Sequence, residues 1–172
     1  MAAGIFDIIG PVMVGPSSSH TAGAVRLGNI ARQIGRQSFV QVDFFLHGSF
    51  AQTYKGHGTD RALLGGILGF APDDERIRDV FNYAARQKLD YHFYTRDLGD
   101  VHPNTVKIVL TYKMGEKCSI VGSSTGGGNI LVTMIDDMEV EFTGQYPTII
   151  TRHLDQPGVV ARAATKLSEH NI

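Results

Sequence analysis

The sequence contains a single cysteine, Cys118, among its 172 residues. Disulfide frameworks, zinc fingers and iron–sulfur clusters each need several cysteine thiolates, so this chain alone cannot assemble any of them. A lone cysteine also fits a reducing compartment. We therefore expect no metal site within this chain and a cytoplasmic location.

The sequence also lacks an excess of charge of either sign. Lys and Arg total 16 and Asp and Glu total 17, which gives a formal net charge of -1. This balance gives no overall positive charge of the kind by which proteins bind nucleic acid or anionic membranes. No apolar run approaches the roughly 20 residues that span a bilayer. We expect a soluble protein with no nucleic-acid partner and no membrane partner.

Glycine is the residue in excess, with 20 of the 172 positions against an average usage of about 7%. Nine of these 20 glycines fall in two short stretches, Gly56–Gly69 and Gly122–Gly128. Hydrophobic residues make up 42% of the chain and charged residues 19%, which is enough for a packed core. The two glycine-rich stretches are therefore the places in which to look for a binding site.

The first half of the chain predicts helices around one strand. Apolar residues recur at helical spacing over residues 19–34, and Gly35 follows as a helix-ending C′ glycine. Residues 38–46 alternate as a strand does. Two helices are expected next, a short one capped by Thr59 and one after Pro72. We expect Gly65 and Gly66 to allow close backbone packing, since glycine is a poor helix former.

From Asp90 the period of the apolar residues changes to two, and turns follow at Gly115 and Asp136-Asp137. This pattern predicts an antiparallel meander. Helices from the N-terminal half would pack on it, so the predicted fold class is α+β with an antiparallel or mixed sheet. A boundary near Gly144 divides the chain into residues 1–144, one complete domain, and residues 145–172. The latter predict a strand over Tyr146–Leu154 and then a helix, too little for a domain of their own.

The motif GPSSSHT, Gly15–Thr21, precedes the first predicted helix. Hydroxyl groups and free backbone N–H groups at a helix start form a site for a carboxylate or phosphate. Serine also favours this position as a simple N-cap. A cap needs only one serine, so we interpret the motif as an anion-binding site that comprises Ser17, Ser18, Ser19, His20 and Thr21.

The motif KGHGTD, Lys55–Asp60, places His57 between two glycines. Flanking glycines let a substrate approach the imidazole closely, and histidine suits proton abstraction near neutral pH. The alternative is a loop histidine without a role.

Two further motifs are polar and glycine-rich. HPNT, His102–Thr105, enters a predicted strand, where His102 and Asn104 could bind a polar ligand or simply form a turn. GSSTGGGNI, Gly122–Ile130, could direct backbone amides of Gly126, Gly127 and Gly128 at an anion, or form a hairpin loop. A zinc site from His20, His57 and His102 is disfavoured because their spacing is not that of metal ligands.

Together these four motifs resemble those of the beta chain of bacterial iron–sulfur-dependent L-serine dehydratase, and the resemblance runs from about Phe6 to the end of the chain. The segment from Tyr146 is similar to the start of an ACT domain. Residues 1–144 resemble the allosteric-substrate-binding type of domain that also occurs in some 3-phosphoglycerate dehydrogenases.

The resemblance implies an L-serine ammonia-lyase that converts L-serine into pyruvate and ammonia. It implies a [4Fe–4S] cluster, held by the cysteines of a partner alpha chain, whose iron polarises the serine hydroxyl as a Lewis acid. The single cysteine here agrees with that division of labour. A chain of this kind would be inactive without its alpha chain.

Carried over by position, the resemblance makes His57 the base that removes the Cα proton, with Thr59 beside it. His102 and Asn104 would complete the pocket or anchor the carboxylate. The hydroxyl-rich motif would bind the carboxylate of serine, either at the active site shared with the alpha chain or at a regulatory site. The alternative is a non-catalytic, serine-sensing regulatory module of a partner enzyme such as a 3-phosphoglycerate dehydrogenase. Exposed strand edges near the C-terminus favour a homodimer.

Overall fold

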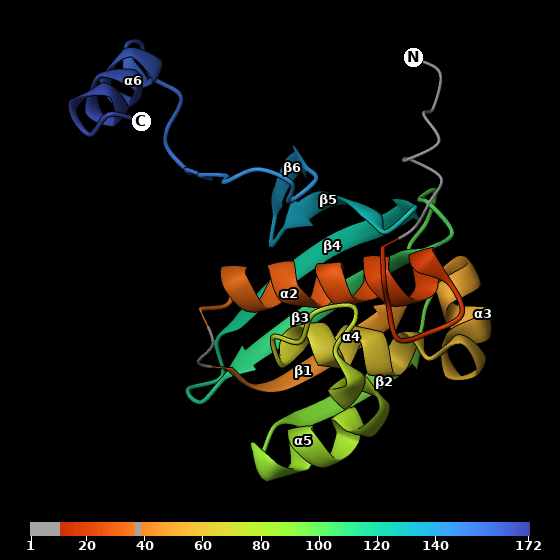
Figure 1. The fold of residues 1–172 in the computed structure, drawn as a ribbon. Coiled ribbons are helices and arrows are strands. Elements are labelled where there is room, and N and C mark those ends of the chain that lie inside the picture. The colour runs from red at the N-terminus through yellow and green to blue at the C-terminus, as the bar shows by residue number, and fades with distance from the viewer. Residues whose placement is uncertain (1–10, 37–38) are drawn as a thin grey trace, which may run out of the picture.

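The computed structural model describes residues 11–36 and 39–172, and it has a layer of helices on one face of a mixed six-stranded sheet (Figure 1). This arrangement confirms the predicted α+β class. The helical layer comes from the N-terminal half of the chain, as predicted. In chain order its members are η1 (Ser18–Gly23), α2 (Ala24–Ile34), α3 (Gly48–His57), α4 (Thr59–Ile67), η2 (Glu75–Asp79) and α5 (Val80–Arg86).

The sheet has the strand order β2-β1-β3-β4-β5-β6. β1 and β2 are parallel, and all helices from α3 to α5 lie in the crossover between them. β1 pairs antiparallel with β3, and β3 to β6 form the predicted antiparallel meander. The strands are β1 (Phe39–Leu46), β2 (Asp90–Thr95), β3 (Thr105–Tyr112), β4 (Lys117–Gly126), β5 (Asn129–Ile135) and β6 (Met138–Phe142).

The alternation predicted for residues 38–46 is confirmed in β1. Val42, Phe44 and Leu46 are 0% exposed and pack in the core under the helices. Ser38, the first residue of the predicted strand, lies outside the described residues, as do the first ten residues of the predicted domain.

Close packing of α2 against α4 explains the glycines in these helices. A Cβ at Gly66 would lie 2.1 Å from the Val25 carbonyl oxygen, and one at Gly28 would lie 2.4 Å from that of Leu63. Two helix backbones therefore meet where no side chain fits, which confirms the packing role predicted for Gly66.

One helix was not predicted from the sequence. Residues Gly48–His57 form α3, so Lys55–His57 are its last turn and not part of a loop. Thr59 does not cap α4 but is its first residue, and Gly58 is the N-cap in the left-handed conformation, with φ 69°. Only Phe50 of α3 is buried, so the segment has no apolar stripe that a pattern search could detect.

The role predicted for Gly35 was also wrong. Gly35 has φ -74°, and the following Arg36 adopts the left-handed conformation instead, with φ 52°. A Cβ at position 35 would lie 2.3 Å from Cδ1 of the buried Leu110, so a larger residue there requires that side chain to shift. The constraint is therefore packing against β3 and not a turn.

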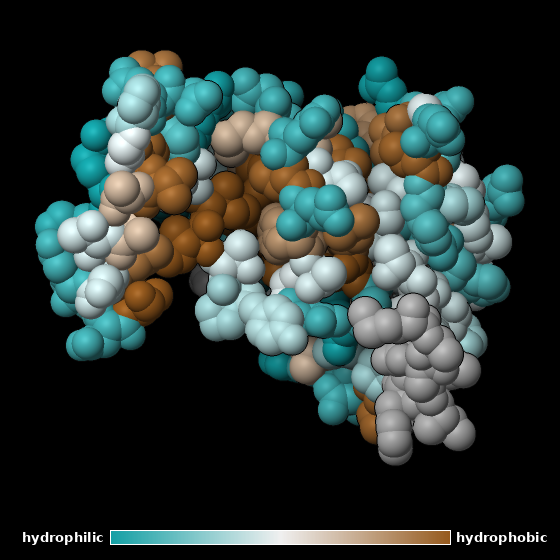
Figure 2. All heavy atoms as spheres, turned by 90° about the horizontal axis from the view of Figure 1, so that it is seen from above, coloured by the Kyte–Doolittle hydropathy of each residue, from teal (hydrophilic) through white to brown (hydrophobic). Residues whose placement is uncertain are grey.

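The predicted strand over Tyr146–Leu154 is absent, because this segment has no neighbouring strand with which to pair. The predicted helix after it is present as α6 (Val159–Glu169). It stands apart from the domain and none of its residues is buried (Figure 1). Figure 2 shows apolar side chains along this part of the molecule, where Tyr146, Ile149 and Leu154 are exposed.

Candidate functional site

The four predicted motifs meet at one end of the sheet, around η1. This six-residue π-helical turn leads directly into α2 and contacts α3, α4, β4 and β5. π-Helical turns are rare and occur frequently at functional sites. The turn begins after Ser17, whose Oγ accepts a hydrogen bond from the backbone N–H of His20.

His20 is buried, with 8% of its surface exposed, and both of its ring nitrogens lie next to serine hydroxyls. Nδ1 is 3.3 Å from Ser17 Oγ, and Nε2 is 3.3 Å from Ser49 Oγ at the start of α3. The ring edge also contacts Phe50. The imidazole is therefore held in one orientation from two sides.

His57 lies beside His20 but reaches the surface. It is the last residue of α3, it is exposed, and its ring centroid is 4.9 Å from that of His20 at an interplanar angle of 87°. The structure thus pairs a buried histidine with an exposed one across two motifs that are far apart in sequence. Thr59, expected beside His57, follows it in α4 but is 0% exposed.

The pKa of His20 is below its ordinary value. Burial is the main cause, and the neighbouring His57 lowers this pKa further, whereas a hydrogen bond with Ser49 acts in the opposite direction. His20 is therefore a neutral imidazole at physiological pH, able to accept one hydrogen bond and donate another.

This lowered pKa makes the stability of the fold depend on pH. Between the pKa of folded His20 and about 6.5, the unfolded chain binds more protons, so the free energy of unfolding rises with pH. We expect Tm to fall between about pH 7 and about pH 5, and His20→Gln to flatten that slope. His170→Gln, at the exposed C-terminal end, is the matched control. Equal slopes in the wild type and His20→Gln would contradict this assignment.

The loop of the HPNT motif packs on the start of α3. The backbone N–H of Ser49 donates to the Pro103 carbonyl oxygen over 2.8 Å. Gly48 has φ 53°, and a Cβ there would lie 2.6 Å from the same oxygen. His102 is exposed and its Nδ1 accepts the backbone N–H of Asn104. The loop therefore reaches His20 through Ser49.

The end of β4 lies against the same turn. The backbone N–H of Ser124 donates to the Asn104 carbonyl oxygen over 3.0 Å, and a Cβ at Gly23 would lie 2.0 Å from Ser124 Oγ. Gly126, the last residue of β4, and Gly127 and Gly128, which form the turn to β5, all have positive φ, which is the hairpin alternative left open by the sequence. Arg26 fixes this turn by donating to the Gly128 carbonyl oxygen over 2.7 Å.

Each of the four motifs contributes one buried polar atom that has no hydrogen-bond partner among the described residues. These atoms are Thr21 Oγ1, Thr59 Oγ1, Asn104 Oδ1 and Ser124 Oγ. An unpaired buried polar group costs about 1–3 kcal/mol, so such groups are expected to have a use. One further atom of this kind, Thr111 Oγ1, lies outside the motifs. The concentration around η1 indicates a site for a polar ligand.

Ser18 and Ser19 are partly buried at the start of η1 and complete the predicted hydroxyl cluster. Ser49 and Phe50 contact His20 directly but were not predicted from the sequence. The sequence contains no pattern that identifies these two residues, because α3 has no periodic apolar face.

A surface hollow opens at His57. It is lined by Gly15, Gly56, Gly58 and three cationic residues, Lys55, Arg61 and Arg78. Gly56 needs explanation, since glycine inside a helix costs about 1 kcal/mol relative to alanine. Its φ is not positive, and a Cβ there would meet nothing within 4 Å. The fold of this chain therefore does not require glycine at position 56.

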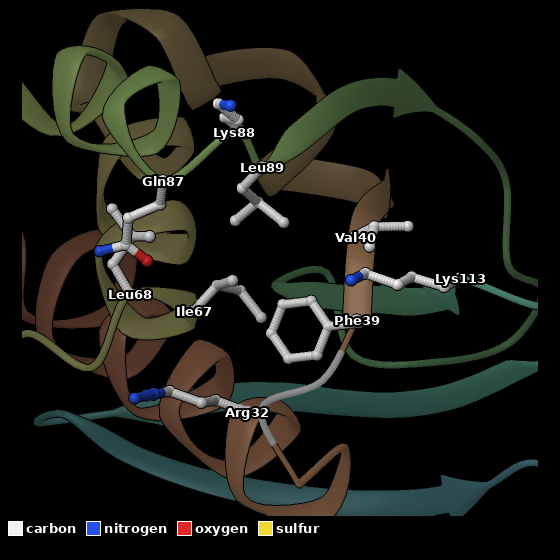
Figure 3. A pocket seen from close by; sticks show the side chains of 9 residues that line it. All are labelled: Arg32, Phe39, Val40, Ile67, Leu68, Gln87, Lys88, Leu89 and Lys113. Carbon is white, nitrogen blue, oxygen red and sulfur yellow. The ribbon is translucent and has the colours of Figure 1, made fainter.

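A second hollow lies where α2, α4 and α5 end (Figure 3). Phe39, Ile67 and Leu89 form its floor, and Lys88 and Lys113 are on its rim. Cations are favoured at helix C-termini by the macrodipole. None of the four motifs lines this hollow, so the candidate site is the one around η1.

The described residues contain no group of three His, Cys, Asp or Glu side chains that could hold a metal ion. His20, His57 and His102 thus form no such group. Cys118 lies in β4, where burial raises the pKa of its thiol. No helix in the part of the chain that the structure describes is long and apolar enough to span a membrane.

The fold and site define a two-layer α+β domain with a histidine- and serine-lined site at one end of its sheet. The sequence model of the serine dehydratase beta chain matches residues 4–93. The L-serine dehydratase beta chain of Peptoniphilus asaccharolyticus is 52% identical over 170 residues, which cover 97% of this chain and 77% of the relative. The chain therefore belongs to the serine dehydratase beta chain family.

Two other relatives extend the comparison. The probable L-serine dehydratase beta chain of Bacillus subtilis is 44% identical, over 98% of this chain and 76% of the relative. An L-serine dehydratase of Haemophilus influenzae is 34% identical over 89 residues, which are 49% of this chain but only 19% of the relative. Most of that longer relative thus lies outside the region that matches this chain.

Proposed function

We propose that this chain is the beta subunit of an L-serine dehydratase, which acts with an alpha chain to convert L-serine into pyruvate and ammonia. The names of the relatives support this function. The observations that carry it are the four unpaired buried polar atoms, one from each motif, and the contact between the rings of His20 and His57. Serine is a small polar ligand with three groups that can use such atoms, a carboxylate, an ammonium and a hydroxyl.

The proposed enzyme uses a [4Fe–4S] cluster, and the residues of this chain do not fit its ligation. A cluster of this type needs several thiolates, whereas the chain has Cys118 alone, half-buried in β4. The proposal therefore assigns the cluster, and with it the activation of the leaving hydroxyl, to the alpha chain. The longer relative from Haemophilus influenzae supports this division, because only 19% of it corresponds to this chain.

His57 is the proposed general base of this chain. It is exposed at the hollow, and the bare surface of Gly58 lets the Cα of serine approach its ring. Buried His20 orients it by ring contact from below. Removal of the Cα proton and loss of the hydroxyl give aminoacrylate, which tautomerises to an imine and is hydrolysed to pyruvate and ammonia.

The remaining predicted residues have proposed binding roles. The carboxylate of serine would lie at the hydroxyl-rich turn of Ser17, Ser18, Ser19 and Thr21. Asn104, whose Oδ1 is buried and unpaired, would accept from the ammonium group, with His102 at the rim. Gly126, Gly127 and Gly128 would supply backbone amides, and Thr59 would position the start of α4.

The test is co-purification of this chain with a cysteine-bearing alpha chain under anaerobic conditions, followed by a serine-to-pyruvate assay. We expect turnover by the mixture and none by either chain alone. A stable complex that holds its cluster but forms no pyruvate would refute the dehydratase function. The regulatory alternative is not favoured, because the relatives reported above are themselves named L-serine dehydratases.

The assignment of residues 145–172 to the start of an ACT domain remains a prediction, as does the boundary at residue 144. The proposed homodimer and cytoplasmic location also stay predictions. The exposed apolar side chains of Tyr146, Ile149 and Leu154 support a covering partner for this segment.

A further inference from the structure

The hollow at His57 has an unbalanced set of charges. Lys55, Arg61 and Arg78 line it and are all exposed, and none of its lining residues is acidic. The whole chain carries a formal net charge of -1, so this concentration of positive charge is local. Three elements, α3, α4 and η2, each contribute one of the cations.

Contacts within the chain neutralise these cations only weakly. Arg78 pairs with Glu75 over 3.2 Å, but both side chains are 71% exposed, where ion pairs contribute little. Arg61 donates to the Arg78 carbonyl oxygen over 3.4 Å, which holds α4 to η2. Lys55 has a cation–π contact with Tyr54, and the partly buried Asp60 at the start of α4 interacts electrostatically with both Lys55 and Arg61. The positive charge therefore remains directed outward.

The glycines on either side of His57 give the same surface its shape. Gly56 and Gly58 have no atom within 4 Å of an added Cβ. Gly58 needs its left-handed backbone, but the fold does not require glycine at position 56. The absence of a side chain there is explained if another surface approaches the backbone closely from outside.

From this geometry we infer that an acidic surface of the alpha chain docks on Lys55, Arg61 and Arg78 and seats its backbone against Gly56. The inference rests on the proposed function, since the alpha chain must bring its cluster to serine at His57. Charge complementarity of this kind steers association and sets the orientation of the two chains.

The test measures the dissociation constant of the two full-length chains under anaerobic conditions at about 0.05 M and about 0.5 M salt. The test variant is Lys55→Glu with Arg78→Glu, both on exposed side chains. The matched control, Lys88→Glu with Lys113→Glu, makes the same charge change at the opposite end of the domain. We expect the test variant to weaken association by roughly tenfold or more at low salt, and the control by less than about twofold.

Gly56→Ala provides a second, uncharged test. Because alanine is the better helix former, we expect this variant to have a higher Tm as an isolated chain but a weaker association with the alpha chain. A merely structural glycine would not give this opposite pair of effects. Association that is unchanged by Gly56→Ala would overturn the close approach.

The docking surface and the proposed reaction can fail separately. Equal affinity of the test and control variants, or affinity that does not change with salt, would overturn the docking surface even if the complex deaminates serine. Salt-sensitive association at Lys55 and Arg78 without pyruvate formation would support the docking surface and refute the reaction. Absence of any association would overturn both.

Discussion

His57→Ala in the assembled alpha–beta complex is expected to lower kcat for serine deamination by about 10²–10⁴-fold, the range typical for loss of a general base. KM should change much less, because the turn at Ser17–Thr21, which we propose binds the carboxylate, remains intact. The cause is geometric, since His57 is the exposed member of the histidine pair and stands at the hollow between two bare glycines. Steady-state pyruvate formation measures both constants.

The control for this prediction is His170→Ala, which removes an exposed histidine beyond α6 and should leave kcat unchanged. His20→Asn separates the two histidines of the pair. We expect it to reduce kcat less than His57→Ala, because His20 is buried and orients its neighbour. If His57→Ala kept full turnover and His20→Asn were inactive, the role of general base would be assigned to His20.

Gly66→Ala is expected to destabilise the fold by about 3 kcal/mol, in the upper range for overpacking a core. A Cβ at this position would lie 2.1 Å from the Val25 carbonyl oxygen and 2.8 Å from the Gly28 Cα. Both contacts are with backbone, so no side chain can move aside. Thermal unfolding should show a Tm lower by about 10 °C for a domain of this size.

Gly56→Ala is the matched control, because it makes the same substitution in a helix where the added methyl group meets nothing. It should raise the unfolding free energy by up to about 1 kcal/mol. Equal stability of the Gly66 and Gly56 variants would show that α2 and α4 do not depend on this contact.

Much of the fold could be predicted because its patterns are local. The alternation of Val42, Phe44 and Leu46 and the period of the later strands determine which residues face the core. The missing helix, α3, has no such pattern, since only Phe50 is buried. The strand predicted over Tyr146–Leu154 has the right residues but no partner, and strand formation requires a neighbour.

In the candidate site, too, the features with a local sequence pattern could be predicted and the contacts between distant segments could not. The sequence identified its four motifs, because clustered glycines and hydroxyls are unusual in themselves. It did not predict that His20 and His57 touch, that Ser49 completes the surroundings of His20, or that Thr59 is buried. These are contacts between distant segments, and sequence spacing carries no information about them.

The central claim is that His57 faces the reacting carbon of serine in the complex with the alpha chain. The most direct measurement is an experimental structure of the anaerobic complex with a serine analogue bound. We predict that a ring nitrogen of His57 lies about 3–3.5 Å from the analogue's Cα, the distance of a reactive geometry, with the hydroxyl-rich turn on the carboxylate. An analogue bound at the cluster with His57 tens of ångströms away would contradict the catalytic account and identify this domain as a regulatory one.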